Sequence, residues 1–361
     1  MAATKDTSEK KVQCPGDNCQ LDLHICRARQ MRGYPPCKQC DSGLTSAKSR
    51  SVQAGKQLQL AAVLDRIVKA YDIRGSYPEQ VNEDLAWRLG YAAADYLLSE
   101  VSGYARAQDS SKAMVVGRDM RIGSTELAAA FIDGALASGA DCIDIGMIDS
   151  PQLYFAINHL ASCGGAQITA SHNPAGDNGF KIAGQAARPV GGDTGLDKIK
   201  ALALAARPGI TRNRSKGKLT QRDLTAQYKM HVLKFAGPIS SFRIVVDASN
   251  GMAGKFVPLL FDELPIKIIP MNFEHDGHFV HPPNPLVDEN LAKLKKTILR
   301  RKANLGVCFD GDADRCVFVD EKGQIVRPDL VTAVLAKEFI FSNPGSTVVY
   351  DLRSSHIVPE A

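Results

Sequence analysis

The stretch "ITASHNPAGDNGFKI", Ile168–Ile182, ends a strand segment and begins a loop rich in turn residues. Upstream, strand-like and helix-like segments alternate along the chain. In order they are "AMVVG" (113–117), a helix from about Ser124 to Gly139, "DCIDIG" (141–146), a helix with Ser150 as N-cap and Pro151 at N1, and "GAQITA" (165–170). This β-α-β-α-β order predicts a layered α/β domain in which much of the sheet is parallel.

The pattern restarts after "RPGITRNRSKGKLT" (207–220), which has five basic and no acidic residues and is typical of an exposed linker. The expected elements are a strand at 242–248, a helix at 251–261, a strand at 266–270, a helix from about Glu289 to Lys302 and a strand at 305–309. A third round begins at "GQIVRPD", with a helix from about Pro328 and a strand at "TVVYD" (347–351). The sequence therefore predicts successive α/β domains.

Composition narrows the class of protein. Hydrophobic residues make up 44% and charged residues 23% of 361 residues, as in soluble globular proteins. We expect no membrane segment, because no long apolar run occurs, and a cytoplasmic protein, because the N-terminus is polar. Of the net charge of +5, residues 1–50 carry nine Lys/Arg against five Asp/Glu, so the remainder is nearly neutral. Nucleic-acid binding is therefore not expected.

Five of the nine cysteines lie within the first 40 residues. A four-thiolate zinc site is predicted from Cys14, Cys19, Cys37 and Cys40, with Cys26 or His24 as competing ligands. The alternative is an extension in which these cysteines are incidental. The stretch "TSAKSRSVQAGKQ" (45–57) is interpreted as a polar linker.

The acidic loop "FDGDADRC" (309–316) follows an apolar strand. Asp310, Asp312 and Asp314 stand at alternate positions, where a turn can converge three carboxylates on Mg²⁺ or Ca²⁺. A solvated acidic turn is the simpler interpretation. An EF-hand would need glycine at the position of Arg315. An aspartyl-nucleophile phosphatase remains a further alternative, although its Asp-x-Asp site normally continues with Thr or Val.

Ser171 lies at the strand end where an α/β sheet presents its ligand-binding edge. Pro174 favours a turn, and the glycines at 176 and 179 permit close backbone approach. Donors suited to a phosphate are nearby: His172, Asn173, Asn178 and Lys181. Ser171 is therefore a candidate phosphate carrier, with an ordinary turn serine as the alternative. No Gly-x-Ser-x-Gly elbow surrounds it, which disfavours an acyl-transfer hydrolase.

Two motifs together, "TASHNP" (169–174) and "DGDADR" (310–315), resemble the α-D-phosphohexomutase family, in particular its bacterial phosphomannomutase/phosphoglucomutase branch. Further matches lie in order at "KAYDIRG" (69–75), "VGRDMR" (116–121) and "NGFKI" (178–182), and the resemblance covers about residues 65–361. It implies three-layer α/β/α domains with mixed sheets. The expected organisation is a Cys-rich extension and linker at 1–58, a phosphoserine-loop domain at 60–206, a metal-loop domain at 219–321 and part of a third domain at 322–361.

The resemblance also implies a reaction. Ser171 would carry a phosphoryl group and, with Asp310, Asp312 and Asp314, would hold Mg²⁺. A hexose 1-phosphate and a hexose 6-phosphate would interconvert through a hexose 1,6-bisphosphate, which is also the activator. Lys181 would be the general acid/base, assisted by Arg74, and His172 would contact the phosphoserine or the sugar. The implied phosphate ligands are Arg118, Asn173, Asn178 and Arg315. Alternatively, Arg74 and Arg118 are structural partners of Asp72 and Asp119.

The family's Gly-Glu-x-Ser-Gly-His sugar loop and its serine-rich distal phosphate loop have no counterpart in the sequence. The chain thus resembles a C-terminally truncated copy, without a fourth domain, and we expect little mutase turnover from it alone. The alternative is a non-catalytic fragment that binds a sugar phosphate or a metal. The retained chemistry would serve both mannose and glucose, and oligomeric state is not predicted.

Overall fold

The computed structural model describes residues 11–14, 19–22, 25–26, 29, 47–101, 112–208 and 215–361. The chain divides into two units, Met1–Arg66 and Ile67–Ala361. No helix of the described residues is both long enough and apolar enough to cross a membrane.

The first unit contains a two-stranded antiparallel hairpin of β1 (Lys11–Cys14) and β2 (Cys19–Asp22). Cys14 and Cys19 are register partners at one end of this pair of strands. Cys37, Cys40 and His24 lie outside the described residues, so the zinc site stays a prediction.

The segment predicted as a polar linker, 45–57, is helical from Ala47 onward, because α2 spans Ala47–Ile67. The stretch contains no proline and a single glycine, Gly55, while its Ala, Lys, Arg and Gln residues have high helix propensity.

The second unit begins with a six-stranded mixed sheet, which has the order β3-β7-β6-β4-β5-β8. Its strands are β3 (Ile73–Ser76), β4 (Ala113–Arg118), β5 (Asp141–Met147), β6 (Gly164–Ile168), β7 (Asp177–Gly184) and β8 (Leu219–Gln221). β7 runs antiparallel to both of its neighbours, and the other pairs are parallel. We call this part of the unit domain I.

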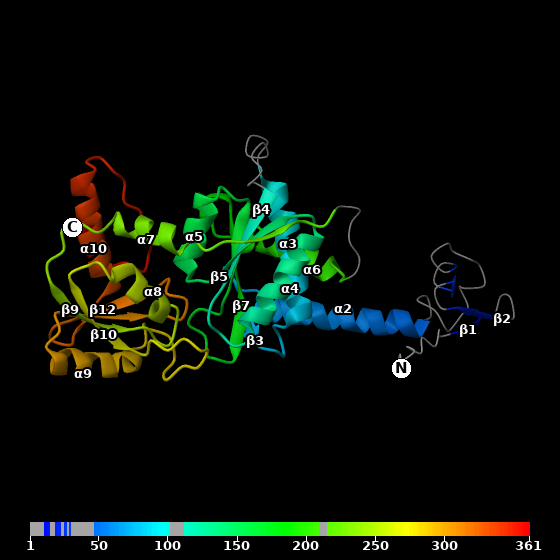
Figure 1. The fold of residues 1–361 in the computed structure, drawn as a ribbon, viewed down its shortest axis with the longest axis horizontal. Coiled ribbons are helices and arrows are strands. Elements are labelled where there is room, and N and C mark those ends of the chain that lie inside the picture. Colours follow the sequence, from blue (N-terminus) through cyan, green and yellow to red (C-terminus); the bar gives the residue numbers. More distant parts are fainter. Residues whose placement is uncertain are drawn as a thin grey trace, which may run out of the picture. The chain divides into compact units, whose positions relative to one another are not determined.

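Helices cover both faces of the domain I sheet, as Figure 1 shows. α3 (Glu83–Glu100), α4 (Ser124–Ala137) and α6 (Leu196–Ala205) lie on one face, and α5 (Ser150–His159) lies on the other. β5 and β6 flank β4 on opposite sides, so right-handed crossovers place α4 and α5 on opposite faces. The predicted α/β layers with a mixed sheet are confirmed.

The start of α5 differs by one residue from the prediction. Asp149 is the N-cap, since its side chain accepts a hydrogen bond from the Gln152 backbone N–H at 2.7 Å. Ser150 is then the first helical residue and Pro151 the second. An aspartate accepts this bond as well as a serine does, so residue type alone did not discriminate between the two.

The second sheet, in what we call domain II, has the order β10-β9-β11-β12-β13. Its strands are β9 (Phe242–Asp247), β10 (Ile266–Met271), β11 (Leu305–Phe309), β12 (Cys316–Asp320) and β13 (Ile325–Val326). β10, β9 and β11 are parallel to one another. β12 runs antiparallel to β11, and β13 runs antiparallel to β12. α8 (Ala253–Phe261) packs on Val246, and α9 (Ala292–Arg301) packs on Val245 from the opposite face.

The remaining elements of the described part of this unit are three 3-10 turns and three helices. They are the 3-10 turns Gln185–Ala187, Gly192–Thr194 and Asp288–Leu291, and the helices α7 (Thr225–Leu233), α10 (Pro328–Ser342) and α11 (Ile357–Glu360). The helix expected from Pro328 is confirmed. The strand expected at 347–351 is wrong: these residues form no strand, and the Val349 side chain is 90% exposed. A strand requires a hydrogen-bonding neighbour, and its local sequence does not supply one.

Candidate active site

The carboxyl ends of two strands, one from each domain, meet at the candidate site. Ser171 follows β6 of domain I, and Asp310 follows β11 of domain II. The Ser171 hydroxyl donates to Asp310 Oδ2 at 2.9 Å. The backbones are also close, because a Cβ at Gly311 would lie 2.4 Å from the Ser171 carbonyl oxygen. Glycine at 311 therefore permits the approach of the two loops.

Ser171 is held in an uncommon conformation. Its φ is +53°, in the left-handed region, and its side chain is buried with 1% of the residue exposed. Its backbone N–H donates to Thr169 Oγ1 at 2.9 Å. The hydroxyl also accepts a hydrogen bond from Arg315 Nη2 at 2.8 Å. Ser171 Oγ thus lies between a carboxylate and a guanidinium.

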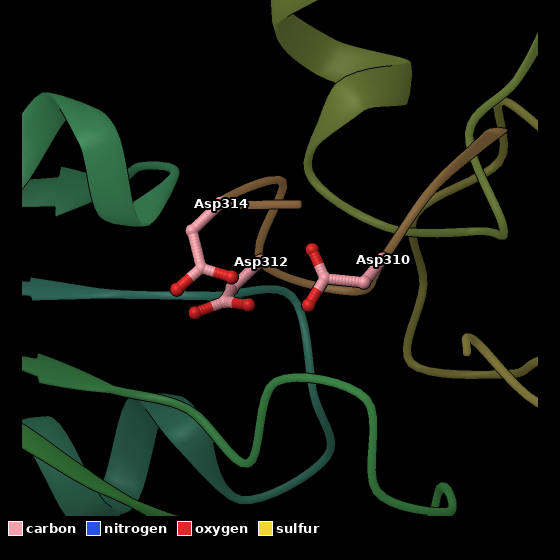
Figure 2. A group of neighbouring side chains, drawn as sticks. All are labelled: Asp310, Asp312 and Asp314. Carbon is pink, nitrogen blue, oxygen red and sulfur yellow. The ribbon is translucent and has the colours of Figure 1, made fainter. Parts of the chain in front are cut away.

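Three carboxylates form the acidic group beside Ser171. Figure 2 shows Asp310, Asp312 and Asp314 turned toward one another around the loop. One ligand atom from each lies within 4.8 Å of the others. Asp310 and Asp312 are fully buried, whereas the Asp314 side chain is 23% exposed.

The acidic group fits a hard divalent cation such as Mg²⁺. Oxygen ligands at this spacing suit such an ion. In addition, Asp312 Oδ1 is buried without a hydrogen-bond partner, although buried polar atoms normally have one. An orphaned buried carboxylate oxygen within a carboxylate cluster is what a cation site would leave.

Two cationic side chains neutralise part of this charge. Lys181 Nζ, on β7, lies 2.6 Å from Asp312 Oδ2 and also contacts Asp314 Oδ2. Arg315 Nη2 lies 2.7 Å from Asp310 Oδ2. Burial and the neighbouring Asp312 and Asp314 nevertheless raise the pKa of Asp310 to about 7.

Lys181 departs from the expectation for a general acid/base, whose pKa should be lowered. Burial by itself lowers the pKa of Lys181, but the carboxylates of Asp312 and Asp314 outweigh it, and the net pKa lies above the ordinary value. The same pairing holds the pKa of Asp312 well below its usual range, although burial opposes this. In this arrangement Lys181 is a protonated partner of the acidic group.

Basic and amide side chains surround the other side of Ser171. Arg315 Nη2 contacts His172 Nδ1, and Arg74 Nη1 lies 3.3 Å from the same atom. Arg74 also donates to Asn173 Oδ1 at 3.0 Å and pairs with Asp72 at 2.5 Å. Burial, Arg315 and Arg74 lower the pKa of His172 to about 4. His172 is therefore neutral at neutral pH, and its Nδ1 accepts.

Two of the predicted phosphate ligands have side-chain hydrogen bonds to other residues. Arg118 Nη1 makes a 3.4 Å contact with the Asp119 carbonyl. Asn178 is fully buried, and its amide nitrogen donates to Ile122 O at 3.1 Å and Ser124 Oγ at 3.0 Å. Both amide hydrogens of Asn178 are thus used inside the fold, which favours a structural role.

Residues that the sequence interpretation did not select also contact the site. Arg121 donates to the Ser171 carbonyl at 2.8 Å. It also forms an ion pair with Asp119 at 3.3 Å. The alternative interpretation had given Arg118 as the partner of Asp119. Ser150 donates from its hydroxyl to Asp312 Oδ2 at 2.5 Å. Arg121 ends the motif "VGRDMR", so it was within reach of sequence reasoning.

Comparisons with known proteins match the two domains. Residues 65–208 match the profile of phosphoglucomutase/phosphomannomutase alpha/beta/alpha domain I, and residues 225–323 match that of domain II. The chain is 36% identical over 293 residues to a phosphomannomutase from Salmonella montevideo, covering 79% of this chain and 62% of the relative. It is 37% identical over 288 residues to phosphohexose mutases from Xanthomonas campestris pv. campestris (strain B100), covering 79% and 61%.

A solved structure agrees with these matches. The crystal structure of a phosphoglucomutase/phosphomannomutase family protein from Burkholderia thailandensis superposes with a TM-score of 0.72 at 32% identity, covering 81% of this chain and 64% of that one. The chain spans 62% of the length of the Salmonella relative. With both family domains matched in order and the fold shared, the chain belongs to the phosphoglucomutase/phosphomannomutase family, whose domains I and II it carries.

Proposed function

We propose that the protein is a phosphohexomutase in which Ser171 carries the phosphoryl group. A hexose 1-phosphate and a hexose 6-phosphate, of mannose, glucose or both, would interconvert through a hexose 1,6-bisphosphate. The observation that carries the proposal is the position of Ser171 Oγ, buried between Asp310 Oδ2 at 2.9 Å and Arg315 Nη2 at 2.8 Å. A hydroxyl paired with a carboxylate and a guanidinium is suited to carry and release a phosphoryl group.

In the proposed transfer, the bond between Ser171 Oγ and phosphorus breaks while a sugar hydroxyl oxygen bonds to the phosphorus. The proton of that hydroxyl must then leave. Lys181 is the candidate to move it. Paired with Asp312 and Asp314, Lys181 is protonated and can donate. To accept a proton it must separate from those carboxylates, because its pKa then falls.

Asp310, Asp312 and Asp314, with an oxygen of phosphorylated Ser171, would hold Mg²⁺. When bound, Mg²⁺ supplies positive charge that neutralises the transferring phosphoryl group. Arg315 and His172 adjoin Ser171, and Arg74 and Asn173 adjoin His172, so these four are the proposed phosphate ligands. Arg118 and Asn178 have weaker support, because their contacts lie elsewhere.

The partner is thus a phosphorylated hexose, and a cytosolic location stays a prediction. The alternative is a domain pair that binds sugar phosphate or metal without transfer. The two differ in one covalent event, which is the appearance of phosphate on Ser171.

Incubation of the purified protein with glucose 1,6-bisphosphate and MgCl₂ tests the proposal. We expect the protein to gain one phosphoryl group, peptide mapping to place it on Ser171, and an equivalent amount of glucose monophosphate to appear. The Ser171→Ala variant should gain none. A matched control is Ser249→Ala, since Ser249 is also buried, has a φ of +49° and follows strand β9, but its hydroxyl donates to the Phe309 carbonyl. Binding of the bisphosphate without phosphate on Ser171 would instead support the non-catalytic alternative.

A further inference from the structure

Arg121 contacts the backbone of the Ser171 loop at four points. Its Nη2 donates to the carbonyls of Ser171 at 2.8 Å and Asn173 at 2.7 Å. Its Nη1 donates to the carbonyls of Pro174 at 2.7 Å and Asp177 at 3.0 Å. One guanidinium therefore binds four of the seven carbonyl groups between residues 171 and 177.

The guanidinium is itself held in place by residues of domain I. Arg121 is only 3% exposed, and its Nε lies 3.3 Å from Oδ2 of the fully buried Asp119. Asp119 Oδ1 also accepts from the Arg121 backbone N–H at 2.9 Å and from the Ser124 hydroxyl at 2.7 Å. Burial raises the pKa of Asp119, and the charge of Arg121 opposes that shift. The ion pair thus opposes the effect of burial on Asp119 and orients the guanidinium.

Domain II covers the same guanidinium. The Phe279 ring centroid lies 5.0 Å from Arg121 Cζ, within range of a cation–π interaction. Gly277, with a φ of +90°, lies against the same segment, because a Cβ there would be 3.0 Å from the Ile122 backbone nitrogen. Arg121 is therefore enclosed by both domains that supply the candidate site.

We infer that Arg121 is a positioning residue, which holds the Ser171 loop in the conformation that aims the hydroxyl at the acidic group. The inference rests on the proposed function for its catalytic consequence. A left-handed serine persists only where surrounding contacts determine its conformation, and Arg121 supplies a bond to the carbonyl of that residue. It acts through the backbone and makes no contact with Ser171 Oγ. Lysine could not replace it, because one ammonium group lacks the planar fork of donors.

The test compares Arg121→Lys with the wild type and with the control Arg88→Lys. Arg88 likewise bonds a carbonyl, that of Ala206, and a carboxylate, that of Asp84 at 2.8 Å, but on α3. The rate of phosphoryl uptake by Ser171 is measured over a range of glucose 1,6-bisphosphate concentrations. Arg121→Lys should lower the saturating rate at least about tenfold and change the half-saturating concentration less than about threefold. The Arg88→Lys variant should match the wild type.

Amide hydrogen exchange supplies a second measurement that does not need transfer. The Asn173 and Asp177 amides donate to the carbonyls of Ala170 at 3.0 Å and Pro174 at 3.1 Å, and in Arg121→Lys they should exchange faster while β6 is unchanged. If Arg121→Lys does not fold, the charge-balanced variant Asp119→Asn/Arg121→Gln is used in its place. It should likewise have a lower saturating rate and faster exchange of the Asn173 and Asp177 amides.

The outcomes separate this inference from the proposed function. A wild-type saturating rate in the Arg121 variant overturns the inference and leaves the function standing. If the wild type itself takes up no phosphate, the proposed function fails, and exchange alone decides. Faster exchange at Asn173 and Asp177 then supports the positioning role, and unchanged exchange overturns it.

Discussion

Asp312 is a residue whose two oxygens have different surroundings. Oδ2 is occupied by the Ser150 hydroxyl at 2.5 Å and by Lys181 Nζ at 2.6 Å, whereas Oδ1 is buried without a partner. The Ser150 backbone N–H also donates to the Asp312 carbonyl at 3.0 Å. Ser150 therefore orients a carboxylate of domain II from domain I, as residues behind a metal ligand commonly do.

Ser150→Ala should weaken Mg²⁺ binding by about tenfold or more, because the carboxylate loses the donor that fixes its rotation. Isothermal titration calorimetry with MgCl₂ measures the effect. The control is Ser138→Ala, since Ser138 is equally buried and its hydroxyl donates to the Ala135 carbonyl at 2.8 Å, away from the acidic group. Equal affinities in Ser150→Ala and the wild type would remove Ser150 from the site.

At the scale of elements, the start of α5 carries a buried carboxylate. Asp149 caps the helix, and burial raises its pKa from the ordinary 3.8 to about 7, with the bond from the Gln152 N–H opposing the shift. Between these two values the folded protein retains a proton that the unfolded chain has released. By linkage, this contribution to stability is fully present below pH 3.8 and is lost as the pH rises to about 7.

Asp149→Asn removes this titration but keeps the side-chain oxygen that caps the helix. The free energy of unfolding of the variant, relative to the wild type, should therefore rise by more than about 1 kcal/mol between about pH 4 and about pH 8. Urea denaturation of both proteins across this range measures the difference. A difference that stays constant with pH would show that Asp149 does not titrate as its burial predicts.

α3 and α4 approach closely through two glycines. A Cβ at Gly90 would lie 1.9 Å from the Phe131 carbonyl oxygen, and one at Gly134 would lie 1.9 Å from that of Trp87. Gly90→Ala should lower the free energy of unfolding by about 1–3 kcal/mol, because backbone must shift to admit the methyl group. Gly55→Ala on α2 is the matched control, as nothing lies within 4 Å of its Cβ position. Thermal or urea unfolding measures both variants. Equal changes in the free energy of unfolding for Gly90→Ala and Gly55→Ala would contradict the prediction.

At the scale of the whole molecule, local patterns predicted the parallel strands well because β4, β5 and β6 are short apolar runs with helices between them. They did not predict that β7 is antiparallel to β6, nor that 347–351 forms no strand, because strand pairing depends on residues distant in sequence. The motifs predicted that Ser171 lies beside the acidic group, and the Ser171 hydroxyl does donate to Asp310 Oδ2 at 2.9 Å. The alternative that paired Asp119 with Arg118 is wrong, since the ion-pair partner of Asp119 is Arg121.

Domains I and II share packing as well as the candidate site. One buried cluster contains Leu153 and Ile157 of α5 together with Phe256 and Leu260 of α8. In addition, the loops after β6 and β11 meet at Ser171 and Asp310, and Lys181 of domain I pairs with Asp312 of domain II. A cation held at the acidic group would therefore act on both domains.

Mg²⁺ should stabilise the protein as a whole, since an ion that binds only the folded state raises the free energy of unfolding. At a hundred times its dissociation constant the gain is about 2.7 kcal/mol. Thermal unfolding with increasing MgCl₂ measures this gain, and amide hydrogen exchange should slow in the loops after both β6 and β11. A variant with Asp310, Asp312 and Asp314 each replaced by Asn should show neither effect, because the hard oxygen ligands have lost their charge. If the triple variant gained as much stability from MgCl₂ as the wild type, Mg²⁺ would bind elsewhere. If amide exchange slowed only in the loop after β11, the ion would not couple the two domains.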